Sequence, residues 1–132
     1  MAKAGLFCSM KPHQELDVWK LSFQYVKEIY EITALFPASE KFGIISQIRR
    51  AAVSIPTNIA EGAGRHSKKE FLYFLNIARG SLSELDTLLI LSHAIGYIEE
   101  LVMNEFVIRL ERISKILNGL VRKINAELTL GR

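Results

Sequence analysis

Apolar residues recur every three or four positions along most of this chain, and no stretch shows the sustained alternation of a half-buried strand. Because a helix turns once in about 3.6 residues, this spacing gathers the apolar side chains on one side of a helix. The pattern predicts four helices, over residues 14–35, 39–63, 68–94 and 98–128. Four long helices with short connections pack most simply as an antiparallel up-down bundle, so we predict an all-α four-helix bundle.

Residues that begin or end helices stand between the four segments. Pro37 follows the first segment, and the residue before a proline disfavours helical geometry. Gly62 and Gly64 supply C-terminal stop signals for the second segment. Ser67 and Glu70 match a capping box at the start of the third. We therefore expect the bundle domain over residues 13–128, between a flexible N-terminal segment, 1–12, and a C-terminal tail, 129–132.

The length and composition are those of one folded domain. The 132 residues can bury a core without a disulfide or metal staple, and Cys8, the only cysteine, leaves no internal disulfide possible. The first residues lack the apolar core of a secretory signal, and no run approaches the about 18 apolar residues that a membrane helix needs. We expect a cytoplasmic protein with no membrane partner.

The second helix has too little polar surface for a helix that packs on one side only. On a helical wheel, a narrow polar stripe separates two apolar surfaces. The stripe holds Gln47, Arg50, Ser54, Asn58, Glu61 and Arg65, and the outer apolar flank holds Val53, Pro56 and Ala60. One apolar surface would face the bundle core, and we predict that the other faces another subunit or a partner.

Pro56 lies inside the same helix, where a proline costs about 3 kcal/mol in an ordinary helix. The apolar ridge stays in phase through Pro56, which favours one bent helix, with Thr57 or Asn58 near the freed carbonyl, over two short helices. The third helix also carries apolar residues outside its main face, which are either isolated exposed side chains or a second interface. They are Leu72, Tyr73, Ile77 and Leu91.

The ligand and catalytic patterns of common enzyme classes are missing from the sequence. No Glu-x-x-His or His-Glu-x-x-His spacing involves His13, His66 or His93. The Gly-x-Gly of residues 62–64 follows no strand and lacks the Gly-Lys-Ser/Thr ending of a phosphate loop. We predict a protein that is not an enzyme and has no catalytic residue, metal or cofactor. An ordered metal or cofactor in the purified protein would revive the enzyme hypothesis.

Basic residues give a stronger functional signal, because they are unevenly distributed. Residues 49–79 hold six bases and two acids, residues 80–105 hold five acids and no base, and residues 106–132 hold six bases and two acids. Five bases of the fourth helix lie within about 140° of one another on the wheel. They are Arg109, Arg112, Lys115, Arg122 and Lys123. Such a stripe can neutralise successive phosphates, although it is also compatible with a solvated helix face.

The turn into the third helix carries a second basic cluster, formed by Arg65, Lys68 and Lys69. Lysines near the positive end of a helix dipole favour a bound anion, so we predict that this cluster also binds nucleic acid. Arg50 has two interpretations. It either pairs with Glu84 or Asp86 of the third helix within an interface, or it contacts nucleic acid directly.

Two stretches resemble a known family. They read FPASEKFGIISQIRRAAVSIPTNIAEGAGR (36–65) and FLYFLNIARGSLSELDTLL (71–89), and LDVWKLS (16–22) and LSHAIGYI (91–98) flank them. They resemble the four-helix-bundle proteins encoded in intervening sequences of bacterial 23S ribosomal RNA genes, the S23 family. The resemblance covers residues 14–125, and the family's relatives include the accessory variability proteins of diversity-generating retroelements.

This resemblance implies an up-down bundle that assembles into a homopentameric ring. For the retroelement relatives it also implies a basic surface that binds nucleic acid and a reverse transcriptase. It also implies that five residues determine the fold or the oligomer interface: Arg49, Arg50, Asn58, Glu61 and Arg79. The apolar flank of the second helix adds Val53 and Pro56 to this set. We therefore predict a non-enzymatic homo-oligomer whose basic surface binds RNA or DNA. The alternative is a protein-interaction scaffold, again homo-oligomeric, that binds no nucleic acid.

Overall fold

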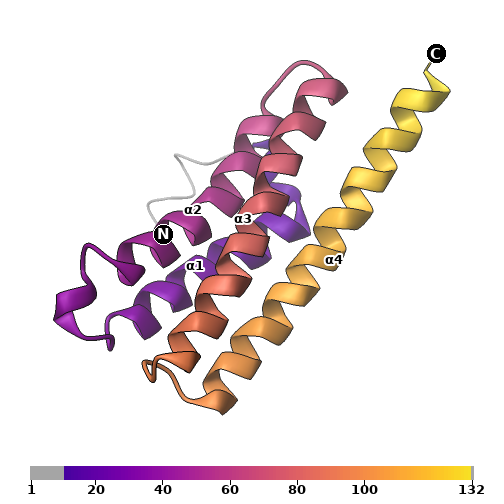
Figure 1. Cartoon of the computed structure of the whole chain (residues 1–132). Helices are drawn as coiled ribbons and strands as arrows, with labels where there is room; N and C mark the ends of the chain where they lie inside the picture. The colour runs from indigo at the N-terminus through magenta and orange to yellow at the C-terminus, as the bar shows by residue number, and fades with distance from the viewer. Residues whose placement is uncertain (1–10, 132) are drawn as a thin grey trace, which may run out of the picture.

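Four α-helices and two short 3₁₀ helices form the structure, a computed structural model that describes residues 11–131 (Figure 1). In chain order they are η2 (Pro12–Glu15), α1 (Asp17–Thr33), η3 (Ala38–Glu40), α2 (Ile44–Ala63), α3 (Lys68–Ala94) and α4 (Glu100–Leu130). The predicted flexible segment falls mostly on residues 1–10, which lie outside the described residues, as does Arg132 of the predicted tail.

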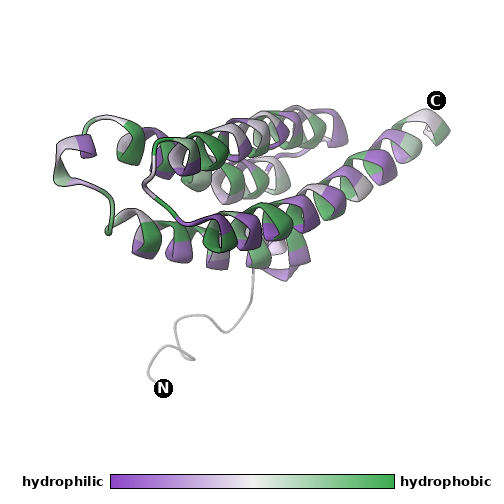
Figure 2. Ribbon diagram, turned by 60° about the horizontal axis from the view of Figure 1, so that its bottom comes forward, coloured by the Kyte–Doolittle hydropathy of each residue, from purple (hydrophilic) through white to green (hydrophobic). Residues whose placement is uncertain are grey.

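The helices pack antiparallel in chain order, which confirms the predicted all-α four-helix arrangement. Helix α2 lies against α1 and α3, and α3 lies against α4. Hydrophobic residues line the inner sides of the helices, while the C-terminal end of α4 extends past the others (Figure 2). The largest fully buried side chains are Tyr25, Ile29, Ile48, Ile55, Ile59, Leu75, Leu85, Leu89 and Leu117. All four helices therefore share one core.

The ends of α3 are fixed by local hydrogen bonds. At its start, the Glu70 amide donates to the Ser67 hydroxyl over 3.1 Å, which is one half of the predicted capping box. The Glu70 carboxylate accepts from the Ser67 hydroxyl over 3.0 Å rather than from the Ser67 amide. At its end, the Tyr97 amide donates to the Ser92 carbonyl over 2.8 Å. Gly96 has a φ of 87°, which a residue with a side chain rarely adopts. The chain therefore leaves α3 through a tight turn that directs it into α4.

Three helices begin later than the sequence pattern predicts, although α4 does so by only two residues. Residues 12–15 form a separate 3₁₀ helix, because extended backbone at Leu16, with a ψ of 127°, interrupts the first predicted helix. The second predicted helix starts at Ile44 rather than near residue 39. Residues 38–40 form η3 instead, and the Glu40 carboxylate accepts a 2.6 Å hydrogen bond from the Tyr97 hydroxyl. A contact with a distant tyrosine thus helps to hold this turn outside α2.

Helix α2 continues through Pro56, so the alternative of two short helices is wrong. The two polar side chains that follow the proline bond to carbonyls of the preceding turn. Thr57 donates to the Val53 carbonyl over 2.8 Å, and Asn58 donates to the Ser54 carbonyl over 2.7 Å. Neither of these bonds reaches the Ala52 carbonyl. That carbonyl lacks its usual helical donor, because Pro56 has no amide hydrogen.

Gly62 has a packing role that its interpretation as a stop signal missed. It lies within α2 and is buried against α3. A Cβ atom at this position would stand 2.8 Å from Phe71 Cδ1 and 2.9 Å from Phe74 Cβ. Only a residue without a side chain therefore allows α2 and α3 to approach so closely here.

Candidate nucleic-acid and subunit interfaces

Arg109, the first member of the predicted basic stripe, is engaged within the chain. Its Nη1 and Nη2 atoms donate to the two carboxylate oxygens of Glu28 over 2.7 and 2.6 Å, which joins α4 to α1. The guanidinium also lies over the rings of Tyr25 and Phe106, at 5.2 and 5.7 Å from their centroids. This ion pair is bidentate, a geometry that the planar guanidinium of arginine allows and the ammonium of lysine does not. Arg109 therefore helps to close the bundle.

The same contact shifts the protonation equilibria of its members. The hydrogen bonds from Arg109 lower the pKa of the Glu28 carboxyl and raise the pKa of the guanidinium. Burial raises the pKa of Tyr25, whose hydroxyl donates to the Phe106 carbonyl over 2.7 Å. Tyr25 therefore stays protonated and serves as a neutral hydrogen-bond donor in the core.

The other four members of the stripe are exposed along α4. They are Arg112, Lys115, Arg122 and Lys123. In the part of the chain that the structure describes, none of them forms an ion pair. Cations at these helical intervals can each meet a separate phosphate.

The second basic cluster lies beside the C-terminal half of α4. Lys68 Nζ stands 3.4 Å from a carboxylate oxygen of Glu127. Arg65 pairs with Glu61 at 3.5 Å and lies over the Phe74 ring, 4.9 Å from its centroid. All of these ion-pair members are substantially exposed, so the pairs are weak and open to competition from a phosphate. The structure thus brings Lys68 of the second cluster to the C-terminal half of α4, which also carries Arg122 and Lys123.

The polar residues of α2 and α3 are mostly engaged within the subunit. Ser81 of α3 donates to the Ser54 hydroxyl over 2.7 Å, and Asn58 donates to the same hydroxyl over 2.9 Å. Arg79 donates to Asn76 on its own helix over 3.0 Å. The ion pair suggested between Arg50 and an acid of α3 is not present among residues 11–131. Ser54 and Ser81 therefore join α2 to α3, and Arg79 is held by a residue of its own helix.

Arg49 joins α2 to the end of α1. Its Nε atom donates to the Thr33 hydroxyl over 2.9 Å, and its Nη2 atom donates to the Tyr30 carbonyl over 3.2 Å. The guanidinium also stacks on the Tyr30 ring, 4.4 Å from the centroid. The C-terminal end of a helix carries the negative end of its dipole, so a cation at this place stabilises α1. The geometry makes Arg49 a fold determinant.

An apolar groove runs along the outer side of α1 and α2. Its volume is about 380 Å³, and its lining contains no carboxylate. Helix α2 forms one wall with Val53, Pro56 and Ala60 of the predicted flank together with Thr57, and the other wall consists of His13, Trp19, Phe23, Val26 and Lys27. Helical spacing predicted the α2 wall but not the α1 wall. The Trp19–Phe23–Val26 spacing is the signal that could have found it, since Phe23 is exposed while Trp19 and Val26 are only partly buried beside the core.

A second hollow, of about 450 Å³, continues from this groove towards the α1–α2 connection. Its lining residues are Tyr30, Lys41, Phe42, Ile45, Ser46, Arg49, Arg50 and Val53, again without a carboxylate. Phe42 is 90% exposed, which is unusual for a large apolar side chain in an ordered turn. Lys41 and Phe42 were not among the predicted site residues. A lysine and a phenylalanine side by side in a short connection were the available signal.

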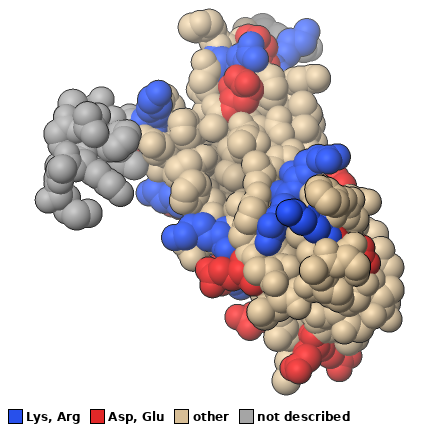
Figure 3. Space-filling model, turned by 90° about the vertical axis from the view of Figure 1, so that its left-hand side faces the viewer, with Lys and Arg blue, Asp and Glu red and all other residues tan. Residues whose placement is uncertain are grey.

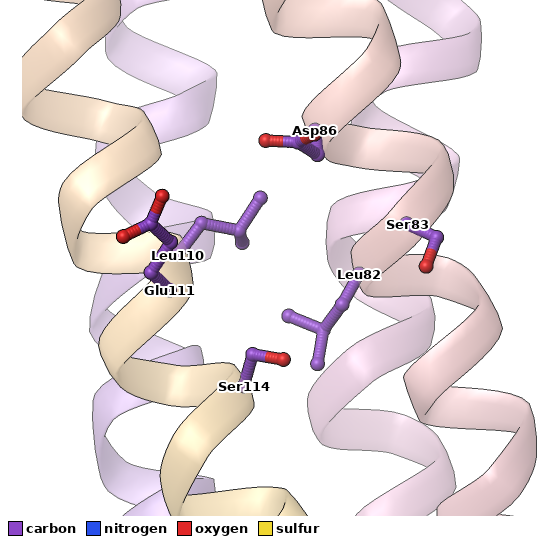
Figure 4. Close-up of a pocket in the computed structure, with 6 residues that line it drawn as sticks. All are labelled: Leu82, Ser83, Asp86, Leu110, Glu111 and Ser114. Carbon is purple, nitrogen blue, oxygen red and sulfur yellow. The ribbon is translucent and has the colours of Figure 1, made fainter.

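A smaller hollow of about 220 Å³ lies between α3 and α4 (Figure 4). Leu82 and Leu110 point into the space between the helices, and Asp86 and Ser114 turn towards it from opposite sides (Figure 4). Ser83 and Glu111 point away from it. Among the described residues, no three His, Cys, Asp or Glu side chains gather closely enough to hold a metal ion. None of the helices described here is long and apolar enough to cross a membrane.

The architecture defines a class of protein, the antiparallel four-helix bundle. The chain belongs to the 23S rRNA-intervening sequence protein family, whose model matches residues 14–119. It is similar to a solved structure of a protein of unknown function from the S23 ribosomal protein family of Bacteroides thetaiotaomicron. The two are 25% identical with a TM-score of 0.74, and the match covers 86% of this chain and 99% of that one. No curated protein matches the chain at a significant level.

Proposed function

We propose that this protein is a non-enzymatic homo-oligomer that binds RNA or DNA, mainly through phosphates. One observation carries the proposal: four exposed cations of α4 form no ion pair within residues 11–131. They are Arg112, Lys115, Arg122 and Lys123. The neighbouring Lys68 and Lys69 extend this basic surface across the turn into α3, because Lys68 reaches Glu127 of α4. A polyanion would gain several phosphate contacts along one end of the bundle.

Self-association is the second part of the proposal, and the apolar groove along α1 and α2 supports it. Val53 and Pro56 belong to one wall, and Trp19 and Phe23 belong to the opposite wall. A contiguous apolar surface of this kind marks an interaction site in many folded proteins. The motif resemblance supports a pentameric ring as the form of this assembly and a relation to accessory variability proteins. Copies of the basic surface around a ring would add their electric fields.

The nucleic-acid part is tested by titrating the protein with a structured RNA at two salt concentrations. With four phosphate contacts per subunit, raising the salt concentration from about 50 to about 200 mM should weaken binding by about 50- to 150-fold. Lys115→Gln should reduce the slope of log affinity against log salt by about one. Lys20→Gln, an exposed lysine of α1, serves as the control and should leave the slope unchanged. Absence of binding at low salt, or binding that is indifferent to salt, would refute this part.

The self-association part is tested by Val53→Asp. A carboxylate in the groove should dissociate the oligomer while leaving helicity intact, since Val53 lies at the surface of the subunit rather than in its core. Gln47→Asp, at an exposed position of the same helix that does not line the groove, is the matched control. Light scattering gives the mass, and circular dichroism gives the helicity. An unchanged mass for Val53→Asp would show that the wrong flank has been assigned.

A scaffold that binds a protein, such as a reverse transcriptase, is the second candidate function. Exposed apolar side chains of α3 favour it: Tyr73 is 62% exposed and Leu91 is 45% exposed. Recovery of a stoichiometric protein partner after nuclease treatment, together with no affinity for RNA, would support this candidate over the first.

A further inference from the structure

The hollow at the α1–α2 connection combines aromatic rings and cations in a way that the proposed phosphate surface on α4 does not. We infer that it is a separate binding site for single-stranded nucleic acid, in which a base stacks on Phe42 and phosphates meet Lys41, Arg49 and Arg50. The inference rests on the proposed function for the class of ligand. It adds a second site and the requirement for unpaired bases.

The first observation is the position of Phe42. Its ring is 90% exposed, yet the turn that carries it is fixed at several points. The Gly43 amide donates to the Glu40 carbonyl over 2.9 Å, and the Glu40 carboxylate accepts from the Tyr97 hydroxyl over 2.6 Å. The Tyr97 ring in turn packs against Phe36, with centroids 5.4 Å apart. An exposed ring on a fixed turn is a preorganised platform for stacking.

The second observation is the charge around that ring. Three cations line the hollow, while its lining includes no carboxylate. Glu40, the nearest acid in sequence, is turned towards Tyr97. Figure 3 views the molecule from the side of the α1–α2 connection and shows Lys and Arg side chains gathered across the middle of this face, beside uncharged surface. Bases on the uncharged surface and phosphates on the cations would complement this arrangement.

The third observation concerns the donors that remain available. Arg49 uses two of its N–H groups on Thr33 and Tyr30, which leaves about three of the five guanidinium donors for a ligand. Within the described part of the chain, Arg50 and Lys41 form no ion pair, and Lys41 Nζ lies over one face of the Phe42 ring, 5.5 Å from its centroid. The Tyr30 ring, 42% exposed under the Arg49 guanidinium, supplies a second aromatic surface. A duplex hides the faces of its bases, so this chemistry selects unpaired strands.

The experiment compares a short labelled oligouridine with the same strand annealed to its complement, by fluorescence anisotropy at one salt concentration. Phe42→Leu keeps an apolar side chain but removes the ring. It should weaken single-strand binding by about 5- to 150-fold, the range for one stacked base, and leave duplex binding unchanged. Phe42→Trp should retain single-strand affinity. Leu101→Ala, which alters a side chain 81% exposed on α4, should have no effect on either ligand.

Three outcomes would overturn the inference. Equal single-strand affinity for Phe42→Leu and the wild type would show that no base stacks there. A change in oligomeric mass for Phe42→Leu would place the ring in a subunit contact. Failure of the wild-type protein to bind the single strand would also end it. If salt-dependent duplex binding persists in that case, the proposed function stands, whereas loss of both kinds of binding removes both proposals.

Discussion

Gly62 and Gly80 should respond in opposite ways to the same substitution, alanine. Both lie within helices, where alanine is more favourable than glycine by about 1 kcal/mol. A Cβ at position 80 would meet no atom within 4 Å, so Gly80→Ala should stabilise the protein by about 0.5–1 kcal/mol. The substitution gains helix propensity at no steric cost.

At position 62, the new methyl group would overlap α3. Two of the three nearest atoms are Phe74 Cβ at 2.9 Å and the Phe71 carbonyl oxygen at 3.1 Å, and neither can rotate away. Forcing a methyl group into such a site costs about 1–3 kcal/mol, and here the upper half of that range applies because the main chain must move. After subtracting about 1 kcal/mol of propensity, we expect Gly62→Ala to destabilise the protein by about 1–2 kcal/mol.

Urea denaturation followed by circular dichroism measures both variants. All proteins should be compared at one concentration, because association with other copies raises the apparent stability. A separation of about 1.5–3 kcal/mol between the two variants corresponds to melting temperatures about 5–11 °C apart for a chain of this length, and the m-values should agree. The reasoning is refuted if Gly62→Ala is as stable as the wild type, since α2 and α3 would then not approach as closely as described.

Three further predictions concern other contacts. Tyr25→Phe should lower stability by about 1–2 kcal/mol in urea denaturation, because the Phe106 carbonyl loses its buried 2.7 Å donor. The lowered pKa of Glu28 means that its ion pair with Arg109 stabilises the fold above pH about 4.5 and is lost as the pH falls through the lower folded-state pKa. Melting temperatures from pH 7 to 3 should therefore fall less steeply for Glu28→Gln than for the wild type, and parallel curves would contradict this. Ser67→Ala should cost about 1 kcal/mol through loss of the α3 cap, and an unchanged melting curve would show that the cap contributes nothing.

Local chemistry explains which parts of this fold could be predicted. Ser67 and Glu70 of the cap are three residues apart, and helical periodicity is likewise a property of neighbouring residues. The start of α2 could not be predicted in this way. The sequence around residues 39–43 is compatible with helix, but Glu40 bonds to Tyr97, which is far away along the chain.

In the candidate sites too, features within one helix could be predicted and contacts between distant segments could not. The wheel placed Arg112 and Lys115 with Arg109 on one face, since all three belong to one helix. It could not show that Arg109 would meet Glu28, 81 residues away, because that pairing depends on how α1 and α4 come together. The hollow around Phe42 likewise draws its lining from two helices and the turn between them.

By itself, the sequence determined that this chain forms helices, where most of them lie and which faces they bury, because hydrogen bonding and amphipathic spacing within a helix act over a few residues. Only the tertiary structure decided that Gly62 is a contact point, that Arg109 closes the bundle, and that cations and rings line one hollow beside the α1–α2 turn. Those properties arise from the packing of distant segments, where distances of a few ångströms decide whether a charge is paired or free.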